Sequence, residues 1–158
     1  MKRRKCTAIV LAAGQGKRMG SRIQKQFLEI CGRPVLYYSL AAFQDSPLID
    51  SMILVTGAAE IPFVQKEIVE KYGFSKVKMV VEGGAERYAS VWKGLQALEH
   101  TLTEEEKEGC VFIHDGVRPF IHEEILSRAF DAVEKYHACA GGRPSKDTVK
   151  IADQDGFV

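Results

Sequence analysis

The residues most able to do chemistry lie in a glycine-rich, basic segment near the start of the chain. This segment reads AAGQGKRMG (Ala12–Gly20), directly follows an apolar run, and has a further lysine, Lys25, close behind it. Glycine backbone can approach a ligand closely, and arginine and lysine are the usual phosphate ligands. A tight turn from a strand into a helix explains the glycines equally well. The three cations Lys17, Arg18 and Lys25 favour a polyphosphate ligand.

The glycine spacing excludes the two standard phosphate-binding motifs. Gly14, Gly16 and Gly20 are one residue too widely spaced for the dinucleotide fingerprint, and the acid that should follow the second strand is missing, because Glu60 lies well beyond it. A P-loop needs Gly-Lys followed by Ser or Thr, which the segment lacks. The segment therefore predicts a phosphate site of another kind.

Two later loops carry further candidates. Gly83–Gly84 precedes a helix that contains Ser90, and free N–H groups with a hydroxyl at a helix start can contact a base or ribose. In HDGVRP, Asp115 comes directly after a predicted strand and is followed by Gly116 and Arg118. A carboxylate there can hold Mg²⁺, which accompanies nucleotide phosphates, although a turn aspartate is the simpler interpretation. The preceding His114 is predicted to be a packed strand residue, not a catalyst.

These loops are separated by alternating strand and helix patterns. Strands are predicted at 6–12, 51–57, 76–84 and 110–116, with a fifth starting at 138–142, and helices at 34–43, 61–73, 87–100 and 122–137. This alternation predicts an α/β fold, a Rossmann-like doubly wound, mostly parallel sheet with helices on both faces. Ligands bind such sheets at the carboxyl ends of the strands, which is where all three loops fall.

The composition predicts one globular domain. The chain has 158 residues, 46% hydrophobic and 27% charged, and a formal net charge of +1. Such a charge gives no bulk attraction to nucleic acid or to a membrane. The four scattered cysteines form no CxxC pair, which favours reduced thiols in a cytoplasmic protein over a zinc site or disulfide framework. The apolar run after MKRRKC is too short for a signal peptide.

The last residues predict a truncated β-hairpin arm. TVKIADQDGFV indicates a strand, a turn and a returning strand of only two residues. Such a short arm cannot bury its apolar side chains. We therefore expect one domain over 1–158 that lacks its C-terminal part, with the arm beginning around 145–158.

Four motifs together resemble one family. LAAGQGKRMG with QKQFLEICGRPVLYYSL, then GGAERYASV, HDGVRPF and KDTVK, occur in the order found in the 2-C-methyl-D-erythritol 4-phosphate cytidylyltransferases of the non-mevalonate isoprenoid pathway. The resemblance runs from the first strand to the end of the chain. It implies that CTP and methylerythritol phosphate give CDP-methylerythritol and pyrophosphate, with Mg²⁺, by in-line attack of the acceptor phosphate on the α-phosphorus.

The resemblance also implies roles for individual residues. Arg18 and Lys25 would be catalytic, and Arg118 and Thr148 would bind the acceptor, with Thr148 on an arm that reaches the partner's active site in a homodimer. Asp115 would face ribose or the metal ion. The nucleotide-binding residues implied are Ala12, Ala13, Gly14, Gln15, Gly16, Gly83, Gly84, Arg87, Ser90, Asp115 and Gly116, with Arg87 supporting the Gly83–Gly84 loop.

Some residues depart from the family pattern. GVRP replaces the commoner GARP and is also similar to the ribitol 5-phosphate cytidylyltransferases, while GGRPSKDT is more glycine-rich and basic than the usual strand before the arm. Ribitol phosphate therefore stays open as the acceptor. A nucleotide-binding module without full activity also stays open, because the expected missing part would carry acceptor-binding residues. The glycine spacing disfavours a dehydrogenase.

Overall fold

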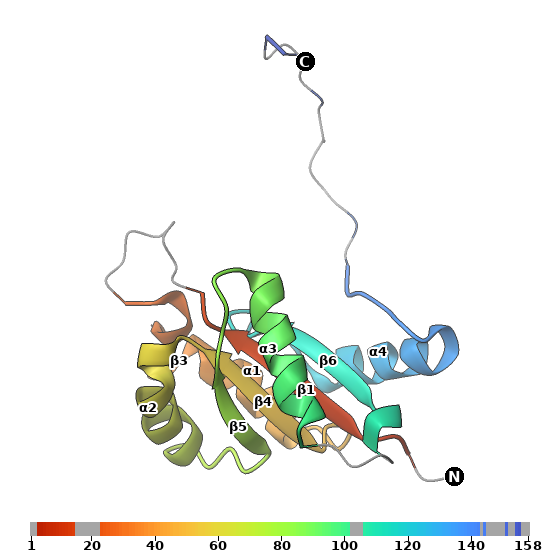
Figure 1. Ribbon diagram of the computed structural model, residues 1–158, viewed down its shortest axis with the longest axis horizontal. Coiled ribbons are helices and arrows are strands. Elements are labelled where there is room, and N and C mark those ends of the chain that lie inside the picture. The colour runs from red at the N-terminus through yellow and green to blue at the C-terminus, as the bar shows by residue number, and fades with distance from the viewer. Residues whose placement is uncertain are drawn as a thin grey trace.

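The main sheet has the predicted parallel arrangement. The computed structural model describes residues 3–14, 23–101 and 106–142, together with 144, 151, 154 and 155. Within them, four parallel strands lie in the order β5-β4-β1-β6 (Figure 1). The strands are β1 (Cys6–Ala12), β4 (Ser51–Thr56), β5 (Val77–Glu82) and β6 (Cys110–Asp115). The first four predicted strands are confirmed to within two residues.

Strand β1 is the centre of the sheet and of the core. All seven of its residues are buried, as a strand covered on both faces requires. The chain proceeds from β1 to β4 and β5 on one side and then returns to β6 on the other. Strand order therefore reverses between β1 and β6, and this reversal opens the crevice in which doubly wound sheets bind ligands.

Helices cover both faces of the sheet, as predicted. Side chains of α1 (Val35–Asp45), the π-helix η4 (Val64–Glu70) and α4 (Glu123–Tyr136) pack with one face of β1. Helix α3 (Arg87–Glu99) packs on the other face against Ile9 and Leu11, and it crosses in front of the sheet in Figure 1. No helix in the described part of the chain is long and apolar enough to cross a membrane.

Local winding departs from the sequence pattern in one helix. The predicted helix at 61–73 consists of the three-residue α2 (Ile61–Phe63) followed by η4, and the short turn η3 (Ala58–Glu60) precedes it. Its end is as predicted, because Gly73 has a φ of +69°, a conformation that suits a helix C′ position.

Two features of the local structure were not anticipated. An antiparallel hairpin joins β2 (Glu29–Ile30) and β3 (Arg33–Pro34), and its two turn residues, Cys31 and Gly32, both have positive φ, as type I′ turns need. The single turn η2 (Lys25–Phe27) precedes the hairpin.

The predicted fifth strand is wrong for residues 138–142. This segment is exposed and forms no strand. Ala-Cys-Ala-Gly-Gly offers little side-chain surface to pack against β6, and paired glycines weaken a strand. The predicted arm at 145–158 lies outside the described residues, apart from 151, 154 and 155, and stays a prediction.

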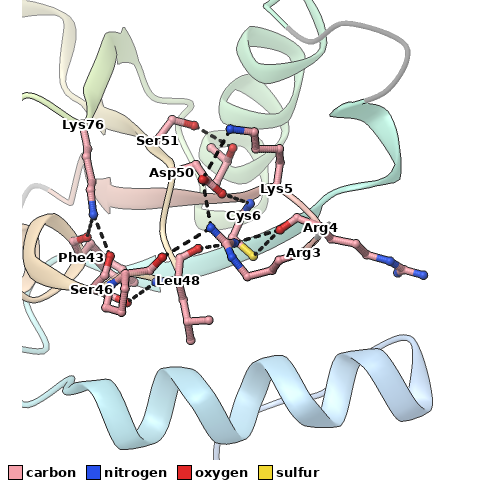
Figure 2. A network of polar contacts seen from close by, with 12 residues as sticks. Arg3, Arg4, Lys5, Cys6, Phe43, Ser46, Leu48, Asp50, Ser51 and Lys76 are labelled. Atoms are coloured by element: carbon pink, nitrogen blue, oxygen red, sulfur yellow. Dashed lines mark hydrogen bonds and ion pairs between the residues drawn. The ribbon is translucent and has the colours of Figure 1, made fainter. Parts of the chain in front are cut away.

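An ion network fixes the amino ends of β1 and β4 (Figure 2). Asp50 accepts a hydrogen bond from the backbone N–H of Cys6 at 2.8 Å and pairs with Arg3 at 3.0 Å and Lys5 at 3.6 Å. Arg3 also donates to the carbonyl of Leu48 at 2.8 Å. Partial burial alone would raise the pKa of Asp50, but the Cys6 N–H and Arg3 outweigh it and hold the pKa below its ordinary value.

The four cysteines are free and divide into two kinds. Cys6 and Cys110 are buried and occupy matching positions on the neighbouring strands β1 and β6. Burial raises the pKa of the Cys6 thiol to about 11. Cys31 and Cys139 are exposed.

Candidate active site at the carboxyl ends of the strands

A cavity of about 380 Å³ lies at the crevice between β1 and β6. It brings together the three loops that the sequence singles out, from residues far apart in the chain. The lining residues are Leu11, Ala12, Ala13, Gly14, Lys25, Gln26, Gly84, Ala85, Glu86, Arg87, Ser90, Asp115 and Val117. The cavity is large enough for a nucleotide-sized ligand.

Most of the predicted site residues in the described part of the chain line this cavity. They are Ala12, Ala13, Gly14, Lys25, Gly84, Arg87, Ser90 and Asp115. Gly83 and Gly116 lie next to lining residues, and Arg118 contacts Asp115. Gln15, Gly16, Lys17, Arg18, Gly20 and Thr148 lie outside the described residues, so their predicted roles stay predictions.

The Gly83–Gly84 loop packs so closely that side chains are excluded. A Cβ atom on Gly83 would lie 2.5 Å from the Cβ of Ala13, and one on Gly84 would lie 2.4 Å from the Cβ of Ala89. Both distances are shorter than real Cβ contacts. The glycines therefore let this loop approach the end of β1 and form one wall of the cavity.

Helix α3 holds the same loop in place. The Ser90 hydroxyl accepts a hydrogen bond from the backbone N–H of Gly84 at 3.0 Å, and Lys93 Nζ donates to the carbonyl of Gly83 at 3.0 Å. Ser90 is 4% exposed. Sequence reasoning assigned Ser90 to ligand contact and missed Lys93; in the structure both stabilise the loop that faces the ligand.

Asp115 is the carboxylate at the centre of the site. Its two oxygens each accept a hydrogen bond at 2.9 Å, one from Arg87 Nε and one from Arg118 Nε. Burial would raise the pKa of Asp115, but the two guanidinium groups outweigh it and hold the pKa below its ordinary value. The group is therefore ionised at neutral pH. The resemblance implies that Arg87 supports the Gly83–Gly84 loop; in the structure its side chain donates to Asp115.

Gly116 and His114 have packing roles on either side of Asp115. A Cβ on Gly116 would lie 2.7 Å from Leu36 Cδ1, and its carbonyl accepts a hydrogen bond from the Ser39 hydroxyl at 3.1 Å. The His114 ring lies 5.3 Å from the Phe43 ring, and burial lowers the pKa of His114 below its ordinary value. The prediction that His114 is a packed strand residue is confirmed.

Gln26 is a buried polar residue of the cavity that the sequence analysis did not assign a role. Its side chain is 1% exposed and donates to the carbonyl of Ala12 at 2.7 Å. In the sequence, its one distinguishing feature is its position beside Lys25 in QKQF. Its burial follows from contacts across 14 residues, which local pattern does not encode.

The described residues do not by themselves form a metal centre. No group of three or more His, Cys, Asp or Glu side chains gathers in the part of the chain that the structure covers. Asp115 and Glu86 are the acids among the lining residues, and both oxygens of Asp115 are held by arginines. This donor set fits a metal ion that arrives with a phosphate ligand, not one bound by the protein alone.

Comparison with known proteins gives one consistent family. Residues 6–158 match the family model described as IspD: 2-C-methyl-D-erythritol 4-phosphate cytidylyltransferase. Curated relatives of that name from Lachnospira eligens and Lachnoclostridium phytofermentans are 45% and 48% identical over 96% and 98% of this chain. The chain spans 63% of the length of each of these relatives.

Solved structures agree with this assignment. The 4-diphosphocytidyl-2C-methyl-D-erythritol synthase of Anaerococcus prevotii superimposes with a TM-score of 0.70 and 32% identity, covering 98% of this chain and 61% of its own. The 2-C-methyl-D-erythritol 4-phosphate cytidylyltransferase of Francisella tularensis gives a TM-score of 0.71 at 25% identity, covering 98% and 64%. The chain belongs to the 2-C-methyl-D-erythritol 4-phosphate cytidylyltransferase family.

Proposed function

We propose that the protein transfers CMP from CTP to 2-C-methyl-D-erythritol 4-phosphate, giving CDP-methylerythritol and pyrophosphate for isoprenoid precursor synthesis. The observation that carries this proposal is the cavity at the strand-order reversal, which combines Lys25, the backbone of Ala12–Gly14 and the ionised Asp115 in a chain of this family. It is a proposal for the enzyme as a whole, of which this chain spans under two thirds of the relatives' length.

Phosphate chemistry of this kind needs positioning and charge neutralisation more than covalent help from the protein. An oxygen of the acceptor phosphate attacks the α-phosphorus of CTP. The bond from the α-phosphorus to the bridging oxygen breaks, and pyrophosphate leaves with that electron pair. In this scheme Lys25, together with Arg18, stabilises the negative charge that builds on the transferring and leaving groups.

The other wall of the cavity suits the nucleoside. The Gly83–Gly84 loop is held by Ser90 and Lys93, which occupy the Gly84 N–H and one lone pair of the Gly83 carbonyl. A carbonyl oxygen has a second lone pair, which can accept a hydrogen bond from the cytosine amino group. Asp115 is ionised and can accept hydrogen bonds from ribose hydroxyls once an arginine releases one of its oxygens. Arg87 and Arg118 are 62% and 74% exposed, so either guanidinium is free to turn toward a phosphate.

We propose that Mg²⁺ enters the site with CTP. The triphosphate would supply most of its oxygen ligands, and Asp115 would supply at most one carboxylate. The ion would neutralise phosphate charge. Removing it with EDTA should therefore abolish turnover, and adding Mg²⁺ in excess should restore it.

The acceptor and the assembly belong to the same proposal. Arg118 and Thr148 would bind the acceptor phosphate, and the arm at 145–158 would join two copies into a homodimer. With a net charge of +1, small phosphorylated molecules are more plausible partners than nucleic acid or a membrane. The four free cysteines fit a cytoplasmic location.

Two measurements test the function. Calorimetry measures CTP binding by the 158-residue chain, and pyrophosphate release is followed with methylerythritol phosphate and ribitol 5-phosphate offered separately. We expect release with methylerythritol phosphate. Pyrophosphate release with ribitol 5-phosphate but not with methylerythritol phosphate would make ribitol 5-phosphate the acceptor. CTP binding without release with either acceptor would indicate a nucleotide-binding module, and no CTP binding would overturn the proposal.

A further inference from the structure

We propose that Gln26 is a positioning residue that fixes Lys25 relative to the end of β1. This inference rests on the proposed function, because it concerns the same cavity and the same lysine. It adds a residue whose task is to hold the catalytic cation and the phosphate-facing backbone in one geometry.

The burial of Gln26 is the first observation. Its side chain is 1% exposed, among the largest fully buried side chains of the described residues. Both amide hydrogens have acceptors, since Nε2 donates to the carbonyl of Ala12 at 2.7 Å and to Oε1 of Gln24 at 2.6 Å. A buried amide without partners is costly, so these contacts hold Gln26 firmly.

The placement of Gln26 is the second observation. Gln26 lies in the turn η2, directly after Lys25, and both residues line the cavity, but Lys25 is exposed while Gln26 is buried. Ala12 is the last residue of β1. The hydrogen bond from Gln26 to Ala12 therefore ties the turn that carries Lys25 to the start of the phosphate-facing segment.

A second anchor holds the turn from its other side. The Phe27 ring packs edge-on to Phe63 at 5.2 Å between centroids, and the Leu28 carbonyl accepts a hydrogen bond from the Val35 N–H at 2.8 Å. These contacts attach the turn to α2 and to the start of α1. Gln26 attaches the turn to β1, and thus sets where Lys25 stands within the cavity.

A chain of amides fixes the orientation of Gln26. Gln24 Nε2 donates to Oε1 of Glu60, in the turn after β4. The Glu60 oxygen accepts this hydrogen bond, so the nitrogen of Gln24 faces Glu60 and its oxygen faces Gln26. Gln26 then has to present its nitrogen, and this nitrogen is the atom that donates to Ala12.

The test compares two glutamines that each make two hydrogen bonds. Gln26→Met keeps the approximate size of the side chain and removes both donors. The matched control is Gln44→Met, because the Gln44 amide donates to Ser75 Oγ and accepts from the Lys76 N–H, each at 3.0 Å. Gln44 does not line the cavity. Its partner Lys76 directly precedes β5.

The first readout is amide hydrogen exchange, which needs no turnover. The N–H groups of Phe27 and Leu28 bond within the turn, to Gln24 and Lys25. We expect them to exchange about tenfold faster in Gln26→Met and at the wild-type rate in Gln44→Met. Unchanged exchange in Gln26→Met would overturn the proposal, as would equal acceleration in both variants.

The second readout is a double-mutant cycle with Lys25→Ala. We expect Gln26→Met to lower kcat by about tenfold to a hundredfold, as a misplaced catalytic group does. In the Lys25→Ala background the same change should cost less than about threefold, because the group that it positions is gone. Equal losses in both backgrounds would show that Gln26 acts independently of Lys25 and would overturn the proposal.

The outcomes separate this inference from the function on which it rests. If the wild-type protein releases no pyrophosphate, the proposed function fails, and amide exchange at Phe27 and Leu28 alone decides about Gln26. If Gln26→Met does not fold, Gln24→Met takes its place, since it removes the second partner of Gln26 and leaves the Ala12 contact. The same exchange and cycle criteria then apply, with smaller expected effects.

Discussion

Two aspartates in this fold are each held between two cationic side chains, one at each end of the sheet. Asp50 lies at the amino ends of the strands with Arg3 and Lys5, and Asp115 lies at the carboxyl ends with Arg87 and Arg118. Their side chains are 25% and 24% exposed, and each has a pKa below its ordinary value. By exposure and charge alone the two clusters look alike.

The partners distinguish the two clusters. Asp50 also accepts a backbone N–H, from Cys6, and its arginine bonds to backbone carbonyls of the loop before β4. Among the described residues, the Asp115 carboxylate accepts hydrogen bonds from the side chains of Arg87 and Arg118, and both arginines are mostly exposed. An ion cluster tied to backbone stabilises a fold, whereas a cluster made of exposed side chains next to a cavity can exchange its partners for a ligand.

Removing Lys25, the cavity cation beside the end of β1, should have the largest effect on activity. Lys25→Ala is expected to lower kcat by about a hundredfold or more, the scale of losing one preorganised charge stabiliser, without a comparable loss of stability. Pyrophosphate release measures it, with the exposed Lys66 changed to alanine as the control. An unchanged kcat with a raised KM would mean that Lys25 binds only the ground state.

Filling the space beside the glycine loop should act next most strongly. Gly83→Ala places a methyl group against Ala13 and Ser90, and the displaced loop should weaken CTP binding by about tenfold, the scale of an overpacked site. Calorimetric titration with CTP measures the change. Gly141→Ala is the control, because a Cβ there has no atom within 4 Å. Equal CTP affinities for the two variants would show that this loop does not take part in nucleotide binding.

Changing each aspartate to asparagine should affect stability and turnover differently at the two sites. Asp50→Asn is expected to lower the free energy of unfolding by about 1–2 kcal/mol, because it weakens a charge-assisted bond to the Cys6 backbone. Asp115→Asn should cost less stability, since exposed ion pairs contribute about 0–1 kcal/mol, but should reduce turnover. Urea unfolding and pyrophosphate release measure the two effects. Equal losses of stability would contradict the contrast between the clusters.

The smallest expected effect is on the acid dependence of stability, compared between wild type and Asp50→Asn. Because the pKa of Asp50 is lowered in the folded protein, the unfolded chain binds more protons, and stability from this group is present above the ordinary pKa of about 3.9. It is lost as the pH falls through the lower, folded value. Urea unfolding between about pH 3 and 6 should show a shallower acid loss in Asp50→Asn than in wild type. Parallel curves would exclude Asp50 as a contributor.

Regular elements of this fold follow closely from local sequence. A parallel strand buried on both faces needs an unbroken apolar run, and β1 and β4 have one, so their positions were predictable. Helix α3 shows the expected stripe, with Leu98 buried and Val91 and Leu95 packed beside it. The three loops of the site were predictable for the same reason, because they follow strands of a sheet whose carboxyl ends meet at one edge.

What escaped prediction depends on contacts between distant residues. The pairing of Arg87 with Asp115 joins positions 28 residues apart, and Arg3 reaches Asp50 across 47. No local pattern indicates either pair. The prediction of a fifth strand was wrong for a related reason. An edge strand forms only where its side chains can pack against a neighbouring surface, and residues 138–142 have few side chains large enough to do so.

The division of the cysteines has a practical consequence for attaching probes. A thiol reacts with maleimides as the thiolate, which Cys6, with its pKa of about 11, forms to a very small extent at neutral pH. Cys110 is shielded beside it, whereas Cys31 and Cys139 are exposed. The unmodified sequence thus offers two attachment points for a fluorophore or spin label, one at the tip of the β2–β3 hairpin and one after α4, without removal of the buried pair.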